Sequence, residues 1–82
     1  MSRNITETQL KRSVKNMRVS LSEMLYEMRQ HNNLSQARLA EIAGVDRKTI
    51  NRIENGHFSP ALDTIVRLSV ALNASPSDLL QG

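Results

Sequence analysis

In the middle of the chain, side chains rich in hydrogen-bond donors are interleaved with two isoleucines, Ile50 and Ile53. In a helix these isoleucines share one face, so burying them turns the polar side chains between and beside them outward. The outward residues are then Arg47, Lys48, Asn51 and Arg52. Such a face either binds a partner rich in acceptors or is only the solvated side of an amphipathic helix.

The other residues that could do chemistry are scattered. His31 and His57 lie in polar stretches without partners at metal-ligand spacing. The serines are not in a nucleophile elbow, and the chain has no glycine-rich phosphate loop. The absence of cysteine excludes disulfides and thiolate metal sites. We therefore expect no enzyme, no metal site and no cofactor.

Length and charge narrow the class further. The chain has 82 residues, 39% of them hydrophobic, and a net charge of +3, which fits one small domain. Residues 1–18 carry five basic and one acidic side chain, whereas residues 19–82 carry six basic and seven acidic ones. The surplus charge therefore belongs to the N-terminal segment and is only a weak sign of nucleic-acid binding. No apolar run approaches the ~18 residues of a membrane span, so we expect no membrane partner and a cytoplasmic location.

The pattern of helix signals predicts an all-α fold, because glycine and proline are few and strand-like alternation is absent. Five helices fit between Ser20 and Gln81. Their start and stop signals are the Ser20-x-x-Glu23 capping box, Ser35 and Gly44 around the second segment, Asp46 and Gly56 around the third, Ser59-Pro60 and Asn73 around the fourth, and Ser75-Pro76 before the fifth. Thr6-x-x-Gln9 is a further capping box upstream.

Apolar spacing predicts one core built from helix faces. Small residues, Ala37, Ala40 and Ala43, are expected where the second and third segments cross, and the segment from Leu62 to Leu72 is the most apolar. Between the second and third segments, Gly44 suits a left-handed turn position, where a Cβ would cost about 1–2 kcal/mol.

Residues 20–82 resemble the helix-turn-helix domain of the Cro/CI-type (XRE) regulators, a five-helix, lambda repressor-like fold. The resemblance extends beyond the turn, over about three quarters of the chain. The matching residues are Leu34-Ser35-Gln36, Leu39-Ala40, Ala43-Gly44-Val45, Thr49-Ile50, Arg52-Ile53-Glu54-Asn55-Gly56, Ser59-Pro60, Leu62, Leu72 and Leu79-Leu80.

The resemblance implies that the segment from Arg47 to Asn55 is a recognition helix in the major groove of double-stranded DNA. It implies base contacts from Arg47, Lys48, Asn51 and Arg52. It also implies phosphate contacts from Gln36, Asn55, Thr49 and Arg38. Glu54 is expected to form a structural ion pair with a neighbouring helix, and Arg38 is the candidate partner.

The implied function is a transcriptional regulator that binds a pseudo-palindromic operator as a homodimer, and we expect it to be a repressor. The pairing surface is expected either on the last two helices (Val70, Ala74, Leu79, Leu80) or on the N-terminal segment. Alternatives are a restriction–modification controller, which the Asp46-Arg47 pair favours, an antitoxin with a toxin partner, or a protein-interaction module that keeps the fold without binding DNA.

Two features depart from the family. Ala61 stands where a polar helix cap is expected, so the cap is predicted at Ser59. Residues 1–19 form a basic extension in which Leu10, Val14 and Met17 continue a heptad seam into the domain. The extension is either part of one helix from about Glu7 to Arg29 or a separate helix or arm that precedes a cap at Ser20. Its residues Lys11, Arg12, Lys15 and Arg18 are expected near DNA phosphates, with subunit pairing and an inert arm as alternatives.

Overall fold

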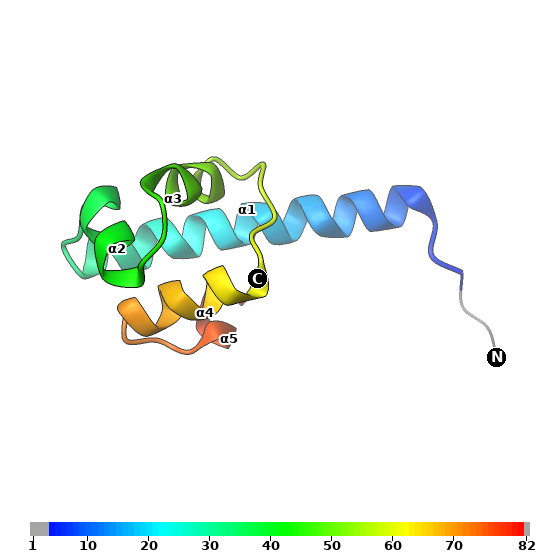
Figure 1. The fold of residues 1–82 in the computed structure, drawn as a ribbon. Coiled ribbons are helices and arrows are strands. Elements are labelled where there is room, and N and C mark those ends of the chain that lie inside the picture. Colours follow the sequence, from blue (N-terminus) through cyan, green and yellow to red (C-terminus); the bar gives the residue numbers. More distant parts are fainter. Residues whose placement is uncertain (1–3, 82) are drawn as a thin grey trace.

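The computed structural model describes residues 4–81, and within this range the chain forms five α-helices and no strand. They are α1 (Glu7–His31), α2 (Gln36–Ala43), α3 (Arg47–Glu54), α4 (Leu62–Ala71) and α5 (Pro76–Leu79). The four short helices gather around the C-terminal half of α1, and the N-terminal half of α1 projects from this body (Figure 1). The molecule is therefore long and narrow, with extents of 46 × 21 × 19 Å. The predicted all-α, five-helix fold is confirmed.

The first helix begins at the upstream capping box. The Gln9 backbone N–H donates to Thr6 Oγ1 at 3.0 Å, and the Thr6 N–H donates back to Gln9 Oε1 at 3.3 Å. From there α1 is continuous, so the alternative of a separate arm with a cap at Ser20 is wrong. Ser20 lies inside the helix, and its hydroxyl donates to the Gln81 carbonyl at 2.7 Å. The capping-box pattern at Ser20 is only local, and no glycine or proline interrupts the helix there.

The turn between α2 and α3 has the predicted geometry. Gly44 has a φ of +71°, in the left-handed region, and its N–H donates to the Ala40 carbonyl. Asp46 then caps α3 by accepting from the Lys48 N–H at 2.9 Å. Three residues between the two helices fix their relative orientation, and Val45 packs against the core beneath the turn.

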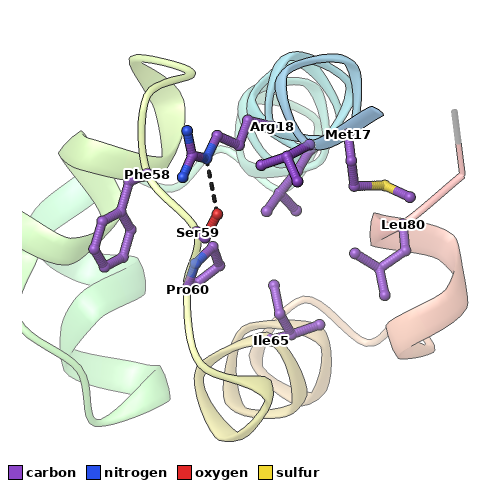
Figure 2. A pocket seen from close by; sticks show the side chains of 9 residues that line it. Met17, Arg18, Phe58, Ser59, Pro60, Ile65 and Leu80 are labelled. Atoms are coloured by element: carbon purple, nitrogen blue, oxygen red, sulfur yellow. Dashed lines mark hydrogen bonds between the residues drawn. The ribbon is translucent and has the colours of Figure 1, made fainter. Parts of the chain in front are cut away.

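The start of α4 differs from the prediction. Its N-cap is Ala61, which has no side chain to accept a hydrogen bond, so the predicted cap at Ser59 is wrong. Ser59 Oγ instead accepts from Arg18 Nε at 2.8 Å, which ties the loop before α4 to α1 (Figure 2). Asp63 in the first turn of α4 is placed to interact favourably with the helix dipole.

The core contains apolar residues from all five helices. Its buried members are Leu21, Leu25, Leu39, Ala40, Ala43, Ile50, Ile53, Ile65, Leu68, Leu72 and Leu79. Two details correct the sequence analysis: Ala37 is exposed, and Leu79 is fully buried and so is not available for subunit pairing. The apolar pattern of α4 is wider than its buried face, because Leu62, Val66 and Val70 are exposed.

In residues 4–81, none of the helices is long and apolar enough to cross a membrane.

Candidate nucleic-acid interface

The α3 helix turns its polar side chains outward, as the isoleucine spacing predicts. Ile50 and Ile53 are buried in the core. The predicted base-contacting residues, Arg47, Lys48, Asn51 and Arg52, are all exposed. Their positions fall on adjacent turns of one helix, so the four side chains form one donor-rich face.

A buried ion pair anchors the C-terminal end of α3. Arg29 of α1 and Glu54 form two parallel hydrogen bonds, from Nε to Oε2 at 2.7 Å and from Nη2 to Oε1 at 2.8 Å. The third nitrogen, Nη1, donates to the Leu34 carbonyl at 2.9 Å. Only 7% of Arg29 is exposed. The hydrogen bonds to Glu54 raise the pKa of Arg29 above its already high ordinary value, so the guanidinium stays charged.

This pair corrects the predicted partner of Glu54. The expectation of a structural pair with a neighbouring helix is confirmed, but the partner is Arg29 and not Arg38. Arg38 pairs with Glu41 one turn along α2, where both side chains are more than half exposed. An exposed pair of this kind contributes little to stability.

A chain of polar side chains leads from the buried pair to the surface. Gln36 Nε2 donates to Glu54 Oε1 at 3.2 Å. Asn51 Nδ2 donates to Gln36 Oε1 at 3.4 Å, and Asn55 Nδ2 donates to Asn51 Oδ1 at 3.2 Å. The structure thus brings together Gln36 of α2, Asn51 of α3 and Asn55, which follows α3. This series of hydrogen bonds is anchored at one end by the fixed carboxylate of Glu54. It therefore orients the amide groups at its other end, which face solvent.

Thr49 and Arg38 lie outside this polar chain. Thr49 is half-buried in the first turn of α3, and its N–H donates to the Asp46 carbonyl at 2.9 Å. Arg38 is exposed in the first turn of α2, where its N–H donates to Ser35 Oγ at 3.0 Å. Both stand in first turns of helices of the motif, and their contact with phosphate remains a prediction.

Arg29 is the structural residue that the sequence analysis missed. Its position holds a usable signal, because Arg29 follows Leu21 and Leu25 at intervals of four on α1. A charged residue on the same helix face as buried leucines is itself expected to be buried, and a buried charge requires a partner of opposite charge.

Within the described part of the chain, histidine and carboxylate side chains do not gather in groups of three that could hold a metal ion.

The fold and this donor-rich face define a helix-turn-helix DNA-binding protein. The HTH_3 family model, described as helix-turn-helix, matches residues 25–79. The chain belongs to this family, the XRE-type helix-turn-helix transcriptional regulators.

Named relatives agree with this membership. The chain is 42% identical over 60 residues to the control protein C.SmaI of Serratia marcescens, covering 73% of this chain and 71% of that protein. It is 37% identical over 62 residues to an uncharacterized HTH-type transcriptional regulator of Haemophilus influenzae, covering 76% of this chain and 63% of the other.

Solved structures show the same fold. The restriction-modification controller protein C.AhdI of Aeromonas hydrophila superposes with a TM-score of 0.73 and 34% identity, covering 76% of this chain and 94% of that one. A similar fold also occurs within an enzyme, the hydroxypropylphosphonic acid epoxidase of S. wedmorenis, with a TM-score of 0.73 and 25% identity. The match covers 82% of this chain but only 36% of the enzyme. The chain is therefore a DNA-binding transcriptional regulator by family, and the fold alone does not distinguish regulators from enzyme domains.

Proposed function

We propose that this regulator reads a specific operator by placing the exposed face of α3 in the major groove, with no catalytic role of its own. The observation that carries the proposal is the outward set of Arg47, Lys48, Asn51 and Arg52 on a helix fixed from behind by buried isoleucines. Arginine and lysine donate to guanine O6 and N7, and asparagine pairs with adenine. A module that kept the fold only for protein contacts would not need three cations together on this face.

Phosphate contacts position α3 before it reads bases. Gln36 lies at the N-terminus of α2, where free backbone N–H groups and the helix dipole favour an anion. Asn55 lies at the opposite end of the motif, just beyond α3. Two contacts at the two ends, assisted by Thr49 and Arg38, set the register of the helix in the groove without reading sequence.

The protein acts as a homodimer on a pseudo-palindromic operator. A recognition helix of eight residues reads only a few base pairs, and two-fold pairing doubles the site while keeping one reading surface. Exposed apolar side chains available for pairing occur on α4, where Leu62, Val66 and Val70 are spaced by four residues. Bound across its own control region, such a dimer represses transcription by occupying the promoter, and binding to chromosomal DNA places it at the nucleoid in the cytoplasm.

Among regulators of this size, we favour a restriction–modification controller over a phage-type repressor or an antitoxin. The support is the similarity to C.SmaI and to the restriction-modification controller C.AhdI, together with the Asp46-Arg47 opening of α3. An antitoxin would require a toxin partner. Genes for a restriction endonuclease and a methyltransferase beside this gene would support the controller function, and a toxin gene in their place would contradict it.

The test of the main proposal is selection from a pool of random duplex DNA by the full chain. We expect enrichment of an inverted repeat whose half-sites lie about one helical turn apart, about 10 base pairs. Sedimentation of the complex should give two chains per duplex. If the selection enriches no sequence, the proposal that α3 reads a specific operator is wrong. If it enriches a single half-site bound by one chain, the homodimer proposal is wrong, whereas the proposal that α3 reads bases still holds.

A further inference from the structure

The N-terminal half of α1 lies outside the family match. The match begins at residue 25. We call residues 7–19 the overhang. Its first part projects from the helical body (Figure 1), and its last part borders the loop before α4, where Val14, Met17 and Arg18 line a hollow with Ser59. At 1.5 Å per residue the overhang is about 20 Å long. Every described residue before Val14 is exposed.

The course of α1 past α3 fixes where the overhang points. Arg29 pairs with Glu54 within α3, a Cβ built on Gly56 would lie 3.6 Å from Ser22 Oγ, and Arg18 donates to Ser59. Moving toward the N-terminus of α1 therefore means moving past the C-terminal end of α3 and along the loop that follows it, where Figure 2 shows the Arg18–Ser59 contact. The overhang begins where α3 has ended.

One edge of the overhang is cationic and faces the same side as the end of α3. Lys15 and Arg18 line a surface hollow together with Asn55 and His57, which follow α3. Lys11 lies one turn further out on the same edge, since it precedes Lys15 by four residues. Asn55 is proposed above to contact a DNA phosphate, so this edge continues directly from a proposed phosphate-contacting position.

The spacing between α1 and α3 is comparable to the depth of the major groove. Packed helices lie about 8–10 Å apart, and the major groove is about 8.5 Å deep and 12 Å wide. When α3 lies at the floor of the groove, α1 lies near the level of the phosphates that border it. An overhang of about 20 Å that continues past the end of α3 is longer than the groove is wide, so it is long enough to reach a phosphate strand beside the groove.

We propose that the overhang is a second DNA-contacting element, in which Lys11 and Lys15 bind backbone phosphates flanking the bases that α3 reads. This inference rests on the proposed function and extends it to a sequence-independent contact outside the half-site. In residues 4–81 the ion pairs are Arg29–Glu54 and Arg38–Glu41, and neither engages the cations of the overhang. A second copy of the chain would bring like charges together along this edge, whereas phosphates neutralise them.

The experiment compares the full chain with the double variant Lys11→Gln/Lys15→Gln on the selected operator carrying ten further base pairs at each end. Each phosphate contact contributes about 0.9 to the slope of log K against log salt, so the variant's slope should be shallower by about 1.8 per bound subunit. The selected sequence should not change, because the overhang reads no bases. On a duplex trimmed to the operator, the two proteins should have nearly equal slopes.

The matched control moves the charge instead of removing it. Ser13 and Asn16 are exposed and line a different hollow of the same helix, away from Lys15. Adding Ser13→Lys/Asn16→Lys to the double variant restores the net charge on that other side. We expect the shallow slope to persist in this quadruple variant.

Three results would overturn the inference. A slope that recovers in the quadruple variant would show that only net charge acts. An unchanged slope in the double variant with loss of the dimer in sedimentation would assign the overhang to pairing with a second copy. An unchanged slope with an unchanged dimer would make the overhang inert. Failure of the proposed function is separate, because it appears in the unaltered protein as an absence of sequence enrichment.

Discussion

Arg52 lies on α3 and Arg29 packs against it from α1, and their environments give them different tasks. Arg52 is exposed, so its five donors are available to acceptors on a partner. Arg29 is buried, and its three nitrogens are already engaged by Glu54 and the Leu34 carbonyl. The first can read DNA, whereas the second can act only by holding Glu54, and through it Gln36, in place.

Replacing a base-reading arginine should remove discrimination without unfolding the protein. For Arg47→Ala or Arg52→Ala we expect the preference for operator over random duplex to fall by about 5- to 150-fold, since one bidentate base contact is worth about 1–3 kcal/mol. Helix content measured by circular dichroism should not change. The charge-matched control is Arg12→Ala at an exposed position of α1, which should lower affinity for both duplexes equally if at all. An unchanged operator preference in both α3 variants would contradict the predicted base contacts.

The buried ion pair should be far more important to stability than the exposed one. Arg29→Met leaves the Glu54 carboxylate buried without its partner, a change that typically costs about 3–5 kcal/mol. Arg38→Met, which breaks the exposed pair with Glu41, should cost no more than about 1 kcal/mol. Urea unfolding of the two variants gives the comparison directly. Equal losses would show that burial does not strengthen the Arg29–Glu54 pair.

Helix boundaries show which parts of the structure could be predicted from local sequence. The turn around Gly44 was predictable because its requirement lies in one residue and its two neighbours. Ser20 and Ala61 were not predictable in the same way. Ser20 carries a start signal inside a longer helix, and Ala61 begins a helix without any capping side chain. In both places packing of Leu21, or of Ile65 and Leu68, determines the helix, and packing depends on residues far away in the sequence.

The same distinction applies to the donor-rich face. Its outward direction followed from the spacing of Ile50 and Ile53, because helical periodicity is a local property. The partner of Glu54 did not follow, because Arg29 lies 25 residues away and only the folded chain brings the two together. The hydrogen bonds that join Glu54 to Gln36 and Gln36 to Asn51 could not be predicted for the same reason.

The two left-handed glycines around α3 offer a test of what fixes the motif. Gly44 and Gly56 have φ values of +71° and +79°, so alanine at either site should cost about 1–2 kcal/mol of backbone strain. At Gly44 an added Cβ would also lie 3.1 Å from Arg67 Nη1, whose hydrogen bond to the Ala43 carbonyl would have to shift. At Gly56 the space is open enough for ordinary contact.

We therefore expect Gly44→Ala to lower the free energy of unfolding at least as much as Gly56→Ala, as measured by urea titration. In addition, Gly44→Ala should weaken operator binding beyond its effect on stability, because the turn sets the angle between α2 and α3. If both variants keep wild-type stability, the left-handed conformations are not required by the fold.

At the scale of the whole molecule, stability and positive charge are located in different places. The buried core runs from Leu21 to Leu79. The surplus positive charge lies in residues 1–18, and the remaining chain is slightly acidic in total. Net charge therefore says little about how α3 recognises DNA, since the cations on α3 are a local feature of a nearly neutral domain.

This separation predicts that the overhang can be shortened without loss of the fold. The described residues that a chain beginning at Ser13 lacks are all exposed, so its free energy of unfolding should stay within about 0.5 kcal/mol of the full chain. Removing residues 76–82 instead takes Leu79 out of the core and should unfold the protein or destabilise it by about 2 kcal/mol or more. Thermal and urea unfolding of the two truncated chains test both statements. A large destabilisation of the chain that begins at Ser13 would mean that the overhang packs against the body, and it would then no longer be free to lie along DNA.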